Sequence, residues 1–388
     1  MRHRSTPVTT TLGGAALVCT AGALGAAVVR YDADAPRLDV LVPLALAALL
    51  AGGWLVAVRA APPVERLPDP AAWQGIPGTL GAIRRDWGYV AAAYLTAWAP
   101  YAAARAAYGK GGSVVGSAYC GLTLLFGVVV SLYAIGLLTG QLGAAQRMLA
   151  EDAASGSVHA VRVRFGTAVR EEYRRPTGTG VGRILTTSSY YVDLVPDGGP
   201  DGGPDGQGAV QLKAMYAGDN FRIPIGEKHL SYAAAQLSGH SGWLCWPTRW
   251  KDIAGTDKQR EVSAAFVADT GHVVWGQMAE QDWEPWLRGE AAPVRETDSG
   301  LTAEPLPHPS RFRPKVHTRT LLITVAAALT AVPYLLGAVP YELGLVLGAG
   351  AGFLTLAAAA RLSVIGVTKQ NMDPNLWTTR TKTHPSLR

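Results

Sequence analysis

Long apolar runs dominate the pattern of hydrophobic and polar positions along the chain. A helix needs about 20 predominantly apolar residues to cross a bilayer, so runs of roughly 18 or more predict membrane spans. Six such runs are present, at residues 8–29, 40–58, 88–108, 114–138, 321–339 and 341–360. The first run is longer than the apolar core of a secretory signal, which favours a retained span.

Between the fourth and fifth runs, the apolar period changes from helical to two. Residues 158–165 and 182–195 alternate in the way that half-buried strands do. Further strands are expected at residues 210–216, 221–225, 242–246, 262–268 and 273–278, and short helices at residues 232–237 and 281–287. Strands of this number, separated by turns, predict a small antiparallel β barrel or sandwich.

The predicted fold class is therefore an α-helical polytopic membrane protein with six spans, arranged 4+2, and an inserted antiparallel β barrel or sandwich domain. Residues 1–140 are expected to form a four-helix transmembrane region and residues 141–310 a β-rich domain. Residues 311–366 would form a two-helix transmembrane region, and residues 367–388 a tail.

The positions of Lys and Arg predict the orientation, because positive residues accumulate in cytoplasmic loops near span ends. They gather at both termini and at both ends of the β-rich insert, whereas Arg30 and Arg37 after the first run are offset by acidic neighbours. We therefore expect a multi-pass protein of the cell membrane, with the insert and both termini in the cytoplasm.

Charge and composition narrow the function classes. Mean hydropathy is +0.13, and only 16% of residues are charged, against about a quarter in soluble proteins. Residues 141–310 hold 16 Lys and Arg against 21 Asp and Glu, a net charge of −5 in a chain of net charge +6. A nucleic-acid-binding protein would carry a basic surface on this domain, so that class is excluded. Three cysteines cannot build a disulfide framework.

The positive charge beside the predicted spans includes two short basic stretches. They consist of Arg84 and Arg85, and of Arg311, Arg313 and Lys315. Each is accompanied by an aromatic residue, and anionic inner-leaflet headgroups attract such residues by about 1 kcal/mol each. We expect both stretches to contact lipid headgroups.

Arg105 is the one clearly intramembrane charge. An ion inside a bilayer is costly, which makes it a candidate for substrate or partner contact. Its position near the outer boundary also allows the long side chain to reach water. No Asp, Glu or His lies near the middle of any run, which counts against an ion-coupled carrier.

Asp269 lies in an Asp-Thr-Gly tripeptide like those of aspartic proteases. Those enzymes pair two such aspartates that share a proton, and this chain has one copy. The alternative is a hairpin turn between residues 266–268 and 273–275, with Asp and Gly as turn residues.

Cys245 is the other candidate nucleophile, with His229, His240 and His272 at some distance along the chain. A Cys/His set is able to form a nucleophile or a metal site, but these spacings match no close-ligand pattern, and strand alternation favours an inert core thiol. No phosphate-binding loop or cofactor motif is found. We therefore lean against an enzyme and expect no metal and no cofactor.

A tryptophan pair is the strongest candidate for a binding site. Trp283 and Trp286 lie among Asp282 and Glu284, which favours one face in water. Interfaces concentrate binding energy in Trp, Tyr and Arg anchors, so we expect these four residues to form a partner-binding edge. The alternative is that both rings pack in the core of the insert.

In length, composition and layout, the chain resembles actinobacterial multi-pass membrane proteins with a cytoplasmic β-domain, including streptomycete proteins that support septation and envelope integrity. No diagnostic motif carries this resemblance, so no residue role is transferred. It implies a non-enzymatic membrane scaffold whose β-domain docks cell-division or cell-envelope machinery. The expected partners are a bilayer with anionic inner-leaflet lipids and a cytoplasmic or membrane protein.

Two other functions stay open. One is a transport-related protein whose insert regulates the spans, and the other is a membrane-bound hydrolase that uses Asp269 or Cys245. Small residues at close spacing in the apolar runs, such as Gly22 and Gly25, suit packing within one bundle or self-association. A homo-oligomer is therefore also open.

Overall fold

The computed structural model describes the chain in two compact units. The described residues are 7–59, 65–70, 75–82, 87–108, 114–139, 142, 144–176, 184–196, 210–214, 226–249, 261–279, 294–306, 322, 332–340, 342–344, 346–347, 350, 353–354, 357 and 374–383. A helical unit comprises residues 1–62, 84–139 and 309–371, and a barrel unit comprises residues 63–83, 140–308 and 372–388. The chain thus enters the barrel unit three times.

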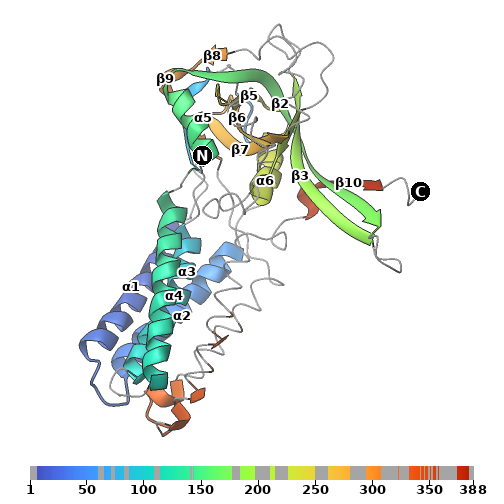
Figure 1. The fold of residues 1–388 in the computed structure, drawn as a ribbon. Helices are drawn as coiled ribbons and strands as arrows, with labels where there is room; N and C mark the ends of the chain where they lie inside the picture. Colours follow the sequence, from blue (N-terminus) through green and yellow to red (C-terminus); the bar gives the residue numbers. More distant parts are fainter. Residues whose placement is uncertain are drawn as a thin grey trace. The chain divides into compact units, whose positions relative to one another are not determined.

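Four long helices of the helical unit can be followed in Figure 1. They are α1 (Pro7–Val29), α2 (Leu38–Arg59), α3 (Trp87–Tyr108) and α4 (Val114–Thr139). Helix α1 contacts α2 and α3, and α3 contacts α4. Buried alanines, among them Ala23 and Ala102, form part of the shared core. Small side chains let the helix backbones approach closely.

Arg37 fastens three of these helices at one end of the unit. Its guanidinium donates to the Ala106 carbonyl of α3 at 3.2 Å, to the Ala26 carbonyl of α1 at 3.4 Å and to the Asp39 carboxylate of α2 at 3.0 Å. Carbonyls in the last turn of a helix lack intrahelical partners. The buried Arg37 therefore binds the ends of two helices with one side chain, and the Ala26 carbonyl also accepts from the Arg30 backbone amide at 3.0 Å.

The predicted six-span fold class is wrong. Among the described residues, α1 is the one helix long and apolar enough to cross a bilayer. Helices α2 and α4 are 22 and 26 residues long, and their described apolar stretches are residues 38–54 and 116–129. Helix α3, one of the expected spans, is rich in the weakly hydrophobic alanine and carries Arg105 in its last turn. Most of residues 321–360 lies outside the described residues.

The barrel unit contains a closed ring of six antiparallel strands. They are β2 (Ser157–Pro176), β3 (Ile184–Pro196), β4 (Val210–Lys213), β5 (Ser241–Trp246), β6 (Glu261–Ala268) and β7 (His272–Ala279). Each strand pairs with the next in the order β2-β3-β4-β7-β6-β5, and β5 pairs with β2 to close the ring. Because the ring is closed, each of its strands has a hydrogen-bonded neighbour on both sides.

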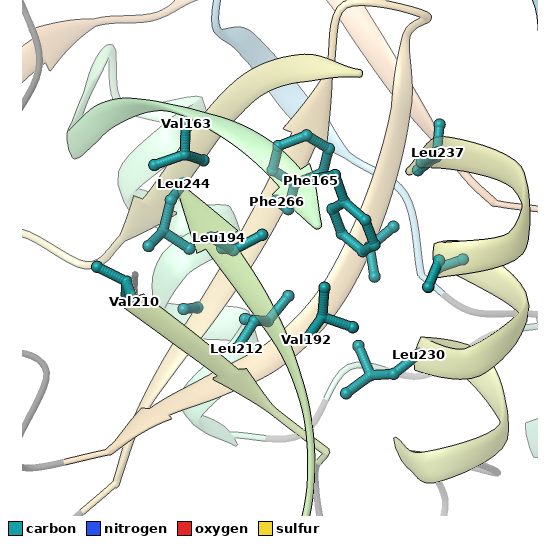
Figure 2. Close-up of a cluster of buried hydrophobic side chains, with 14 of the residues drawn as sticks. Val163, Phe165, Val192, Leu194, Val210, Leu212, Leu230, Leu237, Leu244 and Phe266 are labelled. Carbon is teal, nitrogen blue, oxygen red and sulfur yellow. The ribbon is translucent and has the colours of Figure 1, made fainter. Parts of the chain in front are cut away.

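Alternate residues of these strands fill the barrel interior. Phe165 of β2 and Phe266 of β6 lie 4.7 Å apart between ring centroids, surrounded by Val192, Leu194, Leu212 and Leu244 (Figure 2). Helix α6 (Gly226–Leu237) adds Leu230 and Leu237 to the same cluster. The period-two pattern therefore produces a packed core rather than an open channel.

The outer face of the barrel is also covered in part. Helix α5 (Ala144–Ala154) contributes the buried Leu149 to a second core cluster, together with outward-facing Trp275 of β7. Strand β1 (Pro77–Leu80) pairs in parallel with β9 (Asp298–Pro305), and β9 pairs in parallel with β7. The indole Nε1 of Trp275 donates to the Gly81 carbonyl at 2.8 Å. Residues from before α3 are thereby tied to the barrel.

Two strands and one short helix complete the unit. Strand β8 (Val294–Glu296) pairs with the start of β2, and β10 (Thr378–Thr383) pairs in parallel with its second half. The 3-10 helix η2 (Pro374–Leu376) leads into β10 and contacts α6. None of β1, β8, β9 and β10 was predicted from the sequence.

The predicted strands that fall on described residues coincide with β2 to β7, and the predicted helix at residues 232–237 is the end of α6. The predicted strand at residues 221–225 and the predicted helix at residues 281–287 lie outside the described residues. Alternation located these strands well because every second side chain faces the apolar barrel interior.

Candidate functional site

The second half of β2 forms a three-stranded arm with β3 and β10. Strand β2 pairs with β5 from His159 to Arg164, and with β10 from Val169 to Arg174. In Figure 1 the β2–β3 pair extends beyond the ring of strands, with β10 beside it. A register shift between Phe165 and Ala168 separates the two parts of β2. The arm thus begins at a bulge, which bends a strand and re-aims its side chains.

Gly166 makes this bulge sterically feasible. A Cβ atom built there would collide with the backbone carbonyl oxygen of Asp193 on β3. Only glycine leaves room for so close an approach of two backbones. The sequence therefore specifies the place at which the arm departs from the barrel.

One face of the arm carries a chain of charge-assisted contacts. Lys382 Nζ of β10 lies 2.5 Å from the Glu171 carboxylate of β2, and the Tyr191 hydroxyl of β3 donates to that carboxylate at 3.0 Å. Arg380 Nη2 of β10 lies 3.0 Å from the Asp193 carboxylate of β3. These five side chains therefore join all three strands. We call the set Glu171, Tyr191 and Asp193 the acidic strip.

The contacts shift the pKa values of these groups in consistent directions. Partial burial raises the pKa of Glu171, but hydrogen bonds from Lys382 and Tyr191 and the charges of Lys382 and Arg380 outweigh it, so the pKa is lowered. Burial, followed by the hydrogen bond to Glu171, raises the pKa of Tyr191 to about 12. The charge of Asp193 raises the pKa of Arg380. All these groups are thus held in the states that bind one another at neutral pH.

The opposite face of the arm has its own ion pairs. Glu172 lies 2.5 Å from Arg170 and 3.6 Å from Arg174, all three on β2. The Arg170 guanidinium lies 6.0 Å from the ring centroid of Tyr190, within cation–π distance. Both faces of the arm are therefore polar.

Trp377 anchors β10 to the barrel. Its side chain is buried within the interior cluster and meets Tyr190 edge-on, at 5.0 Å between ring centroids. The C-terminal segment is thus held by one aromatic anchor, two cations and a strand pairing. The sequence pattern predicted only a tail at residues 367–388. The alternation of Thr with Arg and Lys at residues 379–383 was the signal for an amphipathic strand.

Asp269, the candidate catalytic carboxylate, is part of a turn and an ion pair. The β6–β7 turn contains Gly271 with φ of +77°, a conformation that favours glycine. Arg162 of β2 binds both carboxylate oxygens of Asp269, one of them at 2.7 Å, and lies 5.4 Å from the ring centroid of Trp243. The negative charge of this carboxylate is therefore balanced by the Arg162 guanidinium. The geometry supports the turn interpretation over the protease interpretation.

Cys245, the candidate nucleophile, is fully buried on the outer face of β5 in the second core cluster. Burial strongly raises the pKa of its thiol, and the thiolate is the reactive form. His240 is also buried, and its Nε2 lies 3.1 Å from the Leu67 carbonyl, so the two side chains have different surroundings. In the part of the chain that the structure describes, no group of three His, Cys, Asp or Glu side chains is placed to hold a metal ion.

Arg105 lies in the last turn of α3. Its guanidinium is 5.3 Å from the ring centroid of Tyr31, which follows α1. The side chain therefore reaches the end of the helical unit and makes a cation–π contact. This geometry favours the outward-reaching interpretation over a substrate contact in the middle of the helices.

The predicted partner-binding and headgroup residues lie outside the described residues. They are Asp282, Trp283, Glu284 and Trp286, and Arg84, Arg85, Arg311, Arg313 and Lys315. Their roles stay predictions.

Comparison with known proteins provides no family. No family model, no curated protein and no solved structure matches the chain.

Proposed function

We propose that the chain is a non-enzymatic scaffold, which is held at a lipid bilayer by its helical unit and docks a protein partner on its barrel unit. The partner class that fits the sequence is cell-division or cell-envelope machinery. One observation carries the proposal, namely the unequal exposure of large apolar side chains on the two units.

The described helices α1, α2 and α4 expose many large apolar side chains. They are Val8, Val18, Val28, Val29, Leu38, Val42, Leu46, Leu49, Val56, Val114, Leu122, Leu124, Leu125, Val128, Val129 and Leu132. Among the described residues of the barrel unit, only Tyr173, Val195 and Val294 are exposed in this way. Contiguous exposed apolar surface marks a protein or membrane contact. Lipid is the occupant that suits α1, because this helix is long and apolar enough to cross a bilayer.

The barrel unit has the character of a water-exposed binding domain. Its core is closed and filled, and its arm is polar on both faces. Strands β1, β9 and β7 pair with one another, and β10 pairs with β2. These strands of the barrel unit must therefore lie on the same side of a membrane. A partner on that side meets one continuous domain. Asp269 and Cys245 are occupied by structural roles, which supports binding rather than hydrolysis.

Membrane attachment is tested by flotation and alkaline extraction of the intact chain. Val18 lies in the middle of α1 and is 71% exposed. An aspartate at the centre of a spanning helix costs about 2.5–3.5 kcal/mol, so Val18→Asp should release a large share of the chain from membranes. Mass spectrometry of the retained protein should show that α1 is still present.

Val195→Asp is the matched control. Val195 lies on β3 of the barrel unit and is 50% exposed, so the same substitution should leave flotation unchanged. The proposal fails if Val18→Asp behaves like Val195→Asp, or if the mature protein lacks α1 because it was cleaved as a signal.

A further inference from the structure

Strand β10 is attached to the barrel unit through one strand neighbour. It pairs in parallel with β2, from Thr378 opposite Val169 to Thr383 opposite Arg174. The six-strand ring closes through other pairings and does not include β10. Removing β10 would therefore leave the ring closed and expose one edge of β2 along the arm.

The exposed edge would be a strand-binding groove with an acidic side. Main-chain hydrogen bonds give affinity to an added strand, and side chains at alternate positions give specificity. Arg380 and Lys382 are such alternate positions, and they meet Asp193 and Glu171 of the acidic strip. The groove thus favours two cations separated by one residue.

Trp377 adds an aromatic requirement to this pattern. Its ring is buried beside Tyr190, whereas its Nε1 has no hydrogen-bond partner among the described residues. The ring therefore contributes by packing, which another large aromatic side chain would supply as well. The pattern that fits the groove is an aromatic residue followed by cations three and five residues later.

We propose that the β2 edge and the acidic strip form a recognition site for an extended basic segment of a protein partner, and that β10 occupies this site in the intact chain. The inference rests on the proposed scaffold function, because it names the chemistry of the docked partner. Charge complementarity identifies the occupant: the strip is acidic, and the strand seated on it is basic. A tethered segment competes directly with a free partner for the same site, so a partner must bind tightly enough to displace β10.

The test uses a fluorescent peptide with the sequence of residues 374–383 and the detergent-solubilised chain. A chain that ends at Asp373 should bind the peptide at least tenfold more tightly than the intact chain, because the competing strand is gone. A peptide carrying Arg380→Glu and Lys382→Glu should not bind. A Trp377→Phe peptide should bind within a few fold of the original.

Substitutions in the groove distinguish recognition of the peptide's cations from nonspecific binding. Glu171→Gln combined with Asp193→Asn should weaken peptide binding at least tenfold. The matched control is Glu172→Gln, since Glu172 pairs with Arg170 and Arg174 on the opposite face of the arm. It removes one carboxylate from the same strand and should leave the affinity unchanged.

A second variant keeps the test decisive if the shortened chain does not fold. The full-length chain with Arg380→Glu and Lys382→Glu retains Trp377 but loses both ion pairs. Hydrogen exchange at residues 169–174 and 378–383 should then accelerate at least tenfold, and the original peptide should bind more tightly than to the unchanged chain. Absence of both effects would overturn the proposal.

Two further outcomes would contradict the partner assignment. If the charge-reversed peptide binds as well as the original, the strip does not recognise cations. If the intact chain forms dimers that Glu171→Gln with Asp193→Asn abolishes, a second copy occupies the site instead of a partner. Peptide binding is measured without a membrane, and flotation is measured without the peptide. Failure of peptide binding would contradict the recognition site alone, and failure of flotation would contradict the membrane attachment alone.

Discussion

Replacing Asp269 with asparagine gives the sharpest test of its structural role. The substitution keeps the size of the side chain and removes its charge. In the structure both carboxylate oxygens bind Arg162, and the two side chains are 9% and 14% exposed. The asparagine amide would offer one oxygen and leave the guanidinium without a counter-charge between the turn and Trp243.

The free energy of unfolding that Asp269→Asn removes lies between two known limits. An exposed ion pair contributes about 0.2–1 kcal/mol, and breaking a fully buried one costs about 3–5 kcal/mol. Because this ion pair is mostly but not fully buried, breaking it should cost about 2 kcal/mol, which is similar to the loss of a hydrogen bond to a charged group. In a unit of this size about 2–4 °C is lost per kcal/mol, so Asp269→Asn should lower the melting temperature by roughly 4–8 °C.

Hydrogen exchange of the full chain measures this change locally. Amides of β6 and β7 should exchange faster in Asp269→Asn, whereas Glu296→Gln on the exposed strand β8 should change nothing. Activity in cells should survive wherever the protein level is maintained. A variant that keeps the protection of β6 and β7 but loses all function would refute the structural role and revive hydrolysis.

Three other predictions concern the arm and the tryptophan pair. Gly166→Ala should destabilise the barrel unit by about 1–3 kcal/mol in chemical denaturation, because its Cβ would overlap the Asp193 carbonyl. The stabilisation from Glu171 is complete above its unfolded pKa of about 4.3 and is lost as pH falls through its lower pKa in the folded protein. Hydrogen exchange of β10 should therefore become faster below pH 4. An exchange rate that does not change with pH in this way would count against the role of Glu171. Trp283→Ala with Trp286→Ala should weaken partner recovery at least tenfold, about 1.4 kcal/mol, with the melting temperature of the barrel unit unchanged; unfolding would instead place both rings in the core.

The barrel wall was predictable because its strands alternate. Residues such as Val163 and Phe165 point inward while Arg162 points outward, so the period of two is written in the sequence. Strands β1 and β8 are too short to show a period, and β9 is largely exposed. They are defined by pairing with distant residues, which a local pattern does not contain.

The six-span prediction is wrong because an apolar run alone does not specify a span. Among the described helices, α1 is the one long and apolar enough to cross a bilayer, and α3 carries Arg105 among its alanines. Arg37 is a second residue whose environment the sequence pattern did not predict. Its place between two apolar runs predicts a charge in a loop, whereas the structure buries it between three helix ends.

The acidic strip was not predictable from its own segment. Glu171 and Asp193 lie on one hairpin, but their cations Arg380 and Lys382 are about 190–210 residues away along the chain. The basic C-terminal residues were interpreted as an orientation signal of a cytoplasmic tail, because positive charge accumulates in cytoplasmic segments near span ends. The tertiary pairing of β10 with β2 gives them a different set of partners.

Co-flotation tests the central claim most directly, because it requires the membrane anchor and the docking site to act in one molecule. The chain ending at Asp373 is reconstituted into liposomes, mixed with the labelled 374–383 peptide and centrifuged through a density gradient. The account predicts that protein and peptide rise together, and that Glu171→Gln with Asp193→Asn leaves the peptide at the bottom while the protein still floats. Protein that stays at the bottom, or that floats without ever carrying the peptide, would contradict the account.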